Sequence, residues 1–286
     1  MVTTALRRRL PLVAVGIAVV LWSTSFGISS EVLKTASPAV LSVGRFAIGL
    51  IVLMPLAARR PLFARTLRDP RTILLGLLGV AIYYSLTNIG LEFTTPGTAA
   101  LSNAALPALT ALLVLFILKE RLPPRTIVGL AEPQQWAADG RQTVGSVDPL
   151  VLATATAVWG TAIMLPWLIA EMAIGAAAIP SGWAGLGGLL VLGVVITTPT
   201  LVLFNYGAER LPAAATGVLT AAIPALGYLF ALVLGEPFDA ITALGGAVAL
   251  VGVAIASVTA PSTDSSPPGS GLPPQEDVAA CPSARD

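Results

Sequence analysis

Two apolar helical segments joined by a short turn occur twice in this chain of 286 residues. Residues 86–122 align with a second stretch near the other end at a constant offset of 117 positions. The aligned pairs of uncommon residues are Asn88 and Asn205, Gly90 and Gly207, Glu92 and Glu209, and Pro107 and Pro224. In so apolar a sequence, matching Leu and Ala carry little weight. Four matches among rarer residues at one spacing indicate a duplicated unit.

The duplication extends in both directions from this stretch. Upstream, at an offset of 111, the matches are Pro38, Val40, Leu41, Gly49 and Pro55 with Pro149, Val151, Leu152, Gly160 and Pro166. Downstream, at 116, they are Glu120, Thr126, Gly129 and Ala131 with Glu236, Thr242, Gly245 and Ala247. The chain therefore contains two halves of one design.

The composition places both halves in a membrane. Hydrophobic residues make up 55% of the chain and charged residues 11%, and the mean hydropathy is +0.85, outside the range of soluble proteins. Apolar runs of about 20 residues recur, the length that a helix needs to cross the hydrocarbon layer. These runs are continuous rather than alternating, which argues against the strands of a barrel. The predicted fold class is an all-α polytopic membrane protein.

Eight membrane-spanning helices are expected. Arg7–Arg9 followed by Leu10–Leu21 resembles the start of a signal peptide, but no small-residue cleavage site follows. The apolar run continues to Ser30, which favours a first spanning helix. The other seven are expected near residues 38–57, 72–91, 98–118, 149–170, 183–206, 212–234 and 238–257.

The basic residues predict how these helices are oriented. If eight helices alternate from a cytoplasmic N-terminus, 14 of the 16 Lys and Arg lie on the cytoplasmic side. Only Lys34 falls outside, and Arg45 falls within a helix. This asymmetry predicts that both termini are cytoplasmic. The helix at 38–57 then runs inward and its repeat at 149–170 outward, so the repeats are inverted, as in secondary transporters.

One region departs from the duplication. Residues 126–131 (TIVGLA) align with the start of the last helix, but the chain then continues into the polar stretch 132–147, which is costly to place in lipid. The second half also has no partner for the first helix. We therefore expect a first repeat at 10–131 with four helices and a truncated fifth, and a cytoplasmic loop at 132–147. A second repeat at 148–258 lacks its first helix, and a disordered cytoplasmic tail, rich in Pro, Ser, Gly and Asp, follows at 259–286.

Several sequence features together resemble a known family. They are LWSTSFGISSEVLK at residues 21–34, Pro38 with GRFAIGL at 44–50, and the repeated pattern of a mid-helix proline with a closing glutamate. The chain is similar to the drug/metabolite transporter (DMT) superfamily, specifically its EamA-type exporters. The resemblance implies ten helices in two inverted five-helix repeats, a plasma-membrane location, and export of amino acids or other small metabolites. Here the end of helix five and all of helix six are lacking.

Residues in the first two helices are candidates for solute binding. Trp22 and Ser25 belong to a polar interruption near the middle of the first helix. They either face a cavity, or they bond to their own helix and pack against neighbours. Arg45 lies about 10 Å into its helix, at 1.5 Å per residue. A charge at that depth predicts a functional site, and the alternative is a side chain that extends outward to the interface.

Each half carries a set of polar residues on its later helices. They are Tyr83, Tyr84, Asn88, Ser102 and Asn103 in the first half, and Thr197, Thr198, Asn205, Tyr206, Thr216 and Thr220 in the second. From these sets we expect solute contacts at Tyr84, Asn88, Asn103, Thr198, Thr216 and Thr220, and the alternative is hydrogen bonding between helices. Pro107 and Pro224 are candidate hinges, since proline frees a backbone carbonyl, and the alternative is a static kink.

The functional prediction is a secondary transporter, an exporter of small metabolites such as amino acids, that works by alternating access between the repeats. The alternative is a transport-inactive truncated homologue or a membrane interaction subunit. An enzyme is not expected, because the sequence offers no histidine and no paired acids within the helices. No metal, cofactor or nucleic acid is expected. The expected partners are a small solute and the lipid bilayer, with a homodimer if Gly245, Ala249 and Gly252 pack between subunits rather than within one chain.

Overall fold

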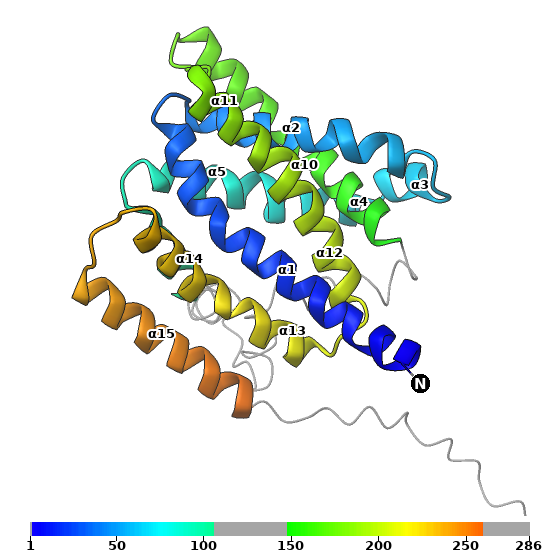
Figure 1. The fold of residues 1–286 in the computed structure, drawn as a ribbon. Helices are drawn as coiled ribbons and strands as arrows, with labels where there is room; N and C mark the ends of the chain where they lie inside the picture. The colour runs from blue at the N-terminus through cyan, green and yellow to red at the C-terminus, as the bar shows by residue number, and fades with distance from the viewer. Residues whose placement is uncertain (1, 106–147, 260–286) are drawn as a thin grey trace, which may run out of the picture.

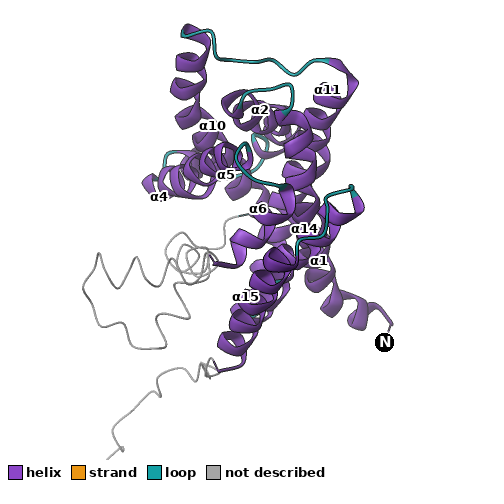
Figure 2. Ribbon diagram, turned by 90° about the vertical axis from the view of Figure 1, so that its left-hand side faces the viewer, coloured by secondary structure: helices purple, strands orange, loops and turns teal. Residues whose placement is uncertain are grey.

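The computed structural model describes residues 2–105 and 148–259, which form helices and loops without a strand in these ranges (Figures 1 and 2). The first part contains α1 (Val2–Leu33), α2 (Pro38–Ala57), α3 (Phe63–Leu67), α4 (Pro70–Leu75), the π-helix η1 (Gly76–Ile82), α5 (Tyr83–Leu91), α6 (Pro96–Ser102) and the 3₁₀-helix η2 (Asn103–Ala105). The second contains α10 (Pro149–Ala173), α11 (Gly182–Leu190), the π-helix η3 (Val191–Thr197), α12 (Thr198–Ala208), α13 (Ala213–Thr220), α14 (Ala222–Val233) and α15 (Ala240–Thr259). The all-helical fold class is confirmed.

Six spans in the described ranges are long and apolar enough to cross a membrane. They are Arg9–Leu33, Pro38–Ala57, Pro70–Leu91, Pro149–Ala173, Gly182–Ala208 and Ala215–Val233. Each matches an expected span to within a few residues, and α15 coincides with the expected eighth. The expected helix at 98–118 leaves the described residues after Ala105. Pro107, the segment 126–131, the loop 132–147 and nearly all of the tail 259–286 also lie outside them.

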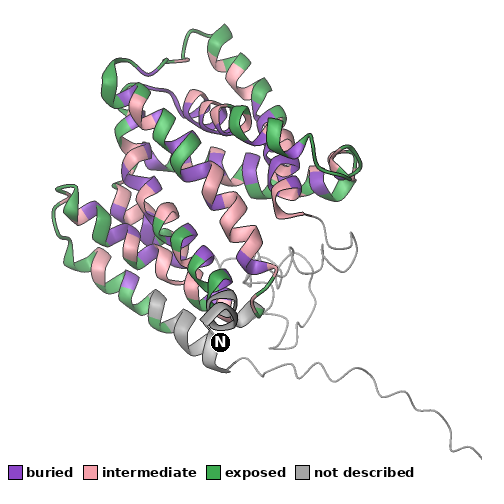
Figure 3. Cartoon of the chain, turned by 45° about the vertical axis from the view of Figure 1, so that its right-hand side comes forward, coloured by how far each residue is buried: buried purple, intermediate pink, exposed green. Residues whose placement is uncertain are grey.

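Helix α1 lies between two groups of helices (Figure 1). On one side it packs against α11 and α12, and beyond them lie α2, α5 and α10. On its other side it packs against α6, α13 and α14, with α15 at the edge of the bundle. Buried residues line the surfaces where these helices face each other, while the outward faces are exposed (Figure 3). Many exposed residues are large and apolar, such as Ile51, Ile169 and Val233, as a lipid-facing surface requires.

Two glycine contacts join the repeats. A methyl group on Gly76 of η1 would lie 2.9 Å from the backbone nitrogen of Gly160 in α10. A methyl group on Gly49 of α2 would lie 3.3 Å from the backbone oxygen of Gly193 in η3. The duplication aligns Gly49 with Gly160 and Gly76 with Gly193. Helix α2 of the first repeat therefore crosses η3 of the second, and its counterpart α10 crosses η1 of the first. The glycines at these points allow the helices to approach closely.

Both repeats carry a seven-residue π-helix in the same helix of the repeat. η1 interrupts the span Pro70–Leu91, and η3 interrupts the span Gly182–Ala208. π-helical turns widen the backbone spiral and change the direction of the side chains that follow, and they are frequent at functional sites. Tyr83 and Tyr84 come directly after η1, and Thr197 is the last residue of η3. The two π-helices thus end at residues that belong to one cluster, described below.

A second repeated irregularity precedes the prolines. α13 ends at Thr220 and α14 begins at Ala222, two residues before Pro224. Proline has no N–H for the carbonyl of Thr220, and its ring crowds that carbonyl, so the helix is interrupted there. In the first repeat, α6 gives way to a 3₁₀ turn at Asn103, the residue aligned with Thr220. The expected helix at 212–234 is therefore one span that is interrupted at Ala221.

Loops that the alternation of spans places on one face contact each other. The Ser37 hydroxyl donates to a Glu171 oxygen at 2.6 Å, and the Gly97 backbone N–H donates to a Glu236 oxygen at 2.9 Å. On the opposite face, Arg60 pairs with Asp148 at 3.3 Å. Each of these contacts joins the first repeat to the second. The expected parity of the spans therefore agrees with the fold.

Candidate functional site

Arg45 on α2 is 2% exposed, the largest side chain among the fully buried residues of the described ranges. Its Nε donates to Thr197 Oγ1 at 3.1 Å, across to η3 of the second repeat. Its guanidinium carbon lies 4.7 Å from the centre of the Tyr84 ring and 5.8 Å from that of Phe46, distances at which a cation is attracted to a ring face. Arg45 does not extend outward to the interface but stays among these groups.

Aromatic side chains from four elements form a connected set that reaches the guanidinium through Tyr84 and Phe46. Trp22 Nε1 on α1 donates to the Tyr84 hydroxyl at 3.1 Å. Tyr84 makes edge contacts with Phe46 and with Tyr83, with ring centres 4.7 and 5.0 Å apart. Trp22 in turn makes an edge contact with Phe204 of α12 at 5.2 Å. We call the set of Trp22, Arg45, Phe46, Tyr83, Tyr84, Thr197 and Phe204 the Arg45 cluster.

The contacts of the cluster can balance the cost of the buried charge, but in the described part of the chain they leave one donor without a partner. An arginine near the centre of a spanning helix costs about 2.5–3.5 kcal/mol on insertion scales. Cation–π contacts return about 0.5–2 kcal/mol each, and a hydrogen bond from a charged donor about 1.5–3 kcal/mol. Arg45 Nη2 nevertheless has no hydrogen-bond partner among the described residues, and neither does Thr200 Oγ1. A buried charged donor without a partner retains its desolvation penalty, so the cluster favours an additional acceptor.

The structure brings some of the expected site residues together and accounts for others locally. Trp22, Arg45 and Tyr84 lie in the cluster, and Asn103 Oδ1 reaches it by accepting from the Tyr83 hydroxyl at 3.3 Å. The hydroxyls of the remaining candidates donate to carbonyls of their own spans: Ser25 to Trp22, Thr198 to Gly193, Thr216 to Pro212, and Thr220 to Thr216 and Gly217. Thr198 also reaches the Gly49 carbonyl of α2 at 3.5 Å. Pro224 is buried at the interrupted helix.

Asn88 joins two helices of the first repeat. It is 1% exposed, and its Nδ2 donates to Ser42 Oγ of α2 at 2.8 Å. Ser42 Oγ donates in turn to the carbonyl of Pro38 at 2.7 Å. The sequence analysis gave hydrogen bonding between helices as the alternative to a solute contact for Asn88, and the structure shows such a bond. The contact accounts for Asn88 as a link between α2 and α5.

We expect Asn88→Ala to lower the free energy of unfolding by about 1–3 kcal/mol, because it leaves a cavity and removes a buried hydrogen bond. The measurement is the melting temperature of the purified protein in detergent. Ser102→Ala is the control, since the exposed Ser102 hydroxyl bonds only to the Thr98 carbonyl of its own helix. Equal melting temperatures for the two variants would show that the link is unimportant.

Phe46, Phe204 and Thr200 were not identified as site residues from the sequence. An aromatic residue in an apolar helix is ordinary, so the sequence contains no signal for the two phenylalanines beyond the position of Phe46 next to Arg45. Thr200 lies three residues after Thr197 and so on the same side of its helix. That spacing is visible in the sequence, but only the position of Arg45 gives it meaning.

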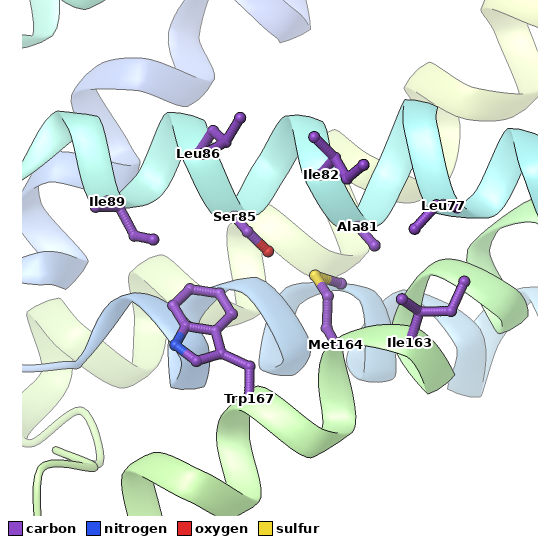
Figure 4. Close-up of a pocket in the computed structure, with 9 residues that line it drawn as sticks. All are labelled: Leu77, Ala81, Ile82, Ser85, Leu86, Ile89, Ile163, Met164 and Trp167. Atoms are coloured by element: carbon purple, nitrogen blue, oxygen red, sulfur yellow. The ribbon is translucent and has the colours of Figure 1, made fainter.

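A groove of about 370 Å³ lies elsewhere, between α10 and the η1–α5 span (Figure 4). Its walls are apolar, with Met164 and Trp167 on α10, and Ser85 contributes a hydroxyl. Ile82 and Leu86, which line it, are 42% and 64% exposed, so it opens on the outer surface of the bundle. No residue of the Arg45 cluster lines this groove, and we place the site at the cluster instead.

Comparison with known proteins agrees with this arrangement. The sequence model of the EamA-like transporter family matches residues 10–131 and again residues 138–258. The chain belongs to the EamA-like transporter family. It is therefore a multi-pass membrane protein of a transporter family, and the two matches correspond to the two repeats of the duplication.

Individual proteins show the same likeness. An uncharacterized transporter from Archaeoglobus fulgidus is 21% identical over 281 residues, which cover 85% of this chain and 97% of that protein. A crystal structure has a TM-score of 0.55 and 22% sequence identity, and the match covers 85% of this chain and 95% of the other. At this identity the structural likeness shows a shared fold.

Proposed function

We propose that this EamA-family protein exports small metabolites such as amino acids by alternating access between its two repeats, with the Arg45 cluster on the solute path. The observation that carries the proposal is a buried guanidinium with an unpaired nitrogen at the meeting point of both repeats. Arg45 and Tyr84 come from the first repeat and Thr197 from the second. A site between inverted repeats is opened to either side when one repeat rocks against the other.

Each member of the cluster has a role in this proposal. Arg45 and Tyr84 contact the solute, and Trp22 holds the Tyr84 hydroxyl in place through its indole N–H. Asn103 extends the polar surface toward α6 through Tyr83. The helix interruption before Pro224 is the proposed hinge of the second repeat, and Pro107 is its proposed counterpart. Asn88, Ser25, Thr198, Thr216 and Thr220 support the helices around the site.

Flux measured in liposomes tests the proposal. The purified full chain is reconstituted into liposomes. The liposomes are loaded with a radiolabelled panel of amino acids, organic acids, amines and sugars. We expect at least one class to leave faster than from liposomes without protein. If no class moves, the alternative function is favoured, that of a transport-inactive truncated homologue or a membrane interaction subunit.

We propose a location in the cell membrane with both termini cytoplasmic, from the distribution of basic residues. A reporter that is active only in the cytoplasm, fused after Val147, is expected to be active, and one fused after Ile174 inactive. Ile174 follows α10 and lies on the same face as Ser37 in the alternation of spans. An inactive fusion after Val147 would reverse the orientation of every later span.

The lipid bilayer and a second copy of the chain are proposed neighbours of α15. Gly246 of α15 packs within the chain, because a methyl group there would lie 2.4 Å from Leu101 of α6. Gly245 faces open space. Packing within the chain therefore explains Gly246 but not Gly245. The face of α15 that carries Gly245 is available to lipid or to a second subunit.

A further inference from the structure

The Arg45 cluster holds a positive charge without a matching negative one in the described part of the chain. The ion pairs found there join Lys34 to Glu31, Arg60 to Asp148 and Arg210 to Glu209. All three involve partly exposed side chains at the ends of spans. Arg45 is in none of them, so its charge is balanced only by ring faces and a hydroxyl.

Within the described ranges, two buried hydrogen-bonding groups lack partners, and one of them is on Arg45 itself. They are Arg45 Nη2 and Thr200 Oγ1, the only buried side-chain N and O atoms without a partner among the described residues. Thr197, which accepts from Arg45 Nε, and Thr200 are three residues apart and share a side of their helix. Because Thr197 faces Arg45, we expect Thr200 on the side of its helix toward Arg45. A charged N–H donor and a hydroxyl donor placed there match an acceptor group with two oxygens.

We infer that the transported solute carries a single carboxylate, bound by Arg45 Nη2 and Thr200 Oγ1, an inference that rests on the proposed function. One guanidinium balances one negative charge, whereas a phosphate carries up to two and calls for further cations. The rings of Tyr84 and Phe46 border the charge. Trp22 on the Tyr84 hydroxyl and Phe204 on Trp22 continue this aromatic surface, so the rest of the solute is apolar or aromatic. The substrate class is therefore amphipathic monocarboxylates, aromatic amino acids included.

Paired ligands test the charge requirement on the unmodified protein. The melting temperature of the full chain in detergent is measured with phenylacetate against phenylacetamide, L-phenylalanine against L-phenylalaninamide, and phenyl phosphate. We expect the two carboxylates to raise the melting temperature and their amides to leave it unchanged. Equal shifts within each pair, no shift with either carboxylate, or a larger shift with phenyl phosphate would each overturn the inference.

Variants test the residues. Arg45→Gln and Thr200→Val are each expected to weaken phenylacetate binding about tenfold or more, the usual loss for a hydrogen bond to a charged group. Arg210→Gln is the matched control, because Arg210 also stacks on a tyrosine, Tyr206, but is exposed, and binding should not change. Thr200→Val keeps the shape of the side chain, so it carries the test if Arg45→Gln does not fold. Wild-type affinity in Thr200→Val would overturn the assignment.

The failure of this inference is distinguishable from that of the proposed function. Flux of panel members without a carboxylate, as fast as that of carboxylates, would leave transport standing and overturn the inference. Arg45-dependent binding of carboxylates without any flux would leave the carboxylate-binding site standing and overturn transport.

Discussion

Gly76→Ala is expected to lower the melting temperature strongly or to prevent recovery of folded protein. The added methyl group would lie 2.7 Å from Trp159 Cβ, 2.9 Å from the Gly160 nitrogen and 3.0 Å from the Thr156 oxygen. Two of these three neighbours are backbone atoms of α10, so a rotamer change does not relieve the contact and the helices must separate. Overpacking of this kind costs about 1–3 kcal/mol or more.

The same substitution at Gly79 is the matched control. Gly79 lies in the same π-helix, one turn from Gly76, and a methyl group there meets nothing within 4 Å. We expect Gly79→Ala to be neutral, or to stabilise by up to about 1 kcal/mol because alanine has the better helix propensity. The measurement is the melting temperature of both variants by size-exclusion chromatography after heating. Equal decreases in melting temperature at the two positions would contradict a specific role for the crossing of η1 with α10.

The second repeat provides an independent copy of this experiment. A methyl group on Gly193 of η3 would lie 2.9 Å from the Arg45 backbone oxygen and 2.7 Å from the Ile48 side chain. Gly187 on the preceding α11 meets nothing within 4 Å. Gly193→Ala is therefore expected to destabilise and Gly187→Ala to be tolerated. The same result in both repeats would show that the two crossings are equivalent parts of one symmetric interface.

A cross-link between the repeats at the contact of Gly97 with Glu236 is expected to abolish transport. In the described state these residues hold α6 of the first repeat against the loop after α14 of the second. Alternating access requires this contact to open once in each cycle. We expect Thr98→Cys with Glu236→Cys, joined through disulfides by a short bis-methanethiosulfonate reagent, to block flux completely. A reductant, which cleaves both disulfides, should restore it.

The design uses a chain with a single cysteine, Cys281, replaced by serine as background. The control pair is Glu31→Cys with Lys34→Cys, which lie on the same face and contact each other at 2.6 Å within the first repeat. Cross-linking the control should leave flux unchanged, because no element moves between those two residues. Full transport by the completely cross-linked test pair would contradict rocking at this contact.

Some parts of the site followed from the sequence, and others did not. Arg45 and Trp22 stood out because charge and polarity are costly in lipid, and a costly residue needs a reason. Tyr84 was identified because it belongs to the set of polar residues on the later helices of the first half. The partnership of Arg45 with Tyr84 and Thr197 was not visible, since it joins residues far apart in the sequence. The two π-helices that bring these partners to Arg45 have no sequence signature.

The sequence by itself determined the limits of most described spans and the duplication, and it predicts that the two repeats are inverted. Each depends on transfer into lipid, a cost that adds up residue by residue and is therefore readable from the order of residues alone. Only the tertiary structure decided which faces meet: Gly76 with Gly160, Asn88 with Ser42, and Arg45 with the aromatic rings. Inside a bilayer nearly all helix faces are equally apolar, so the choice among them depends on the fit of particular side chains and on hydrogen bonds across helices.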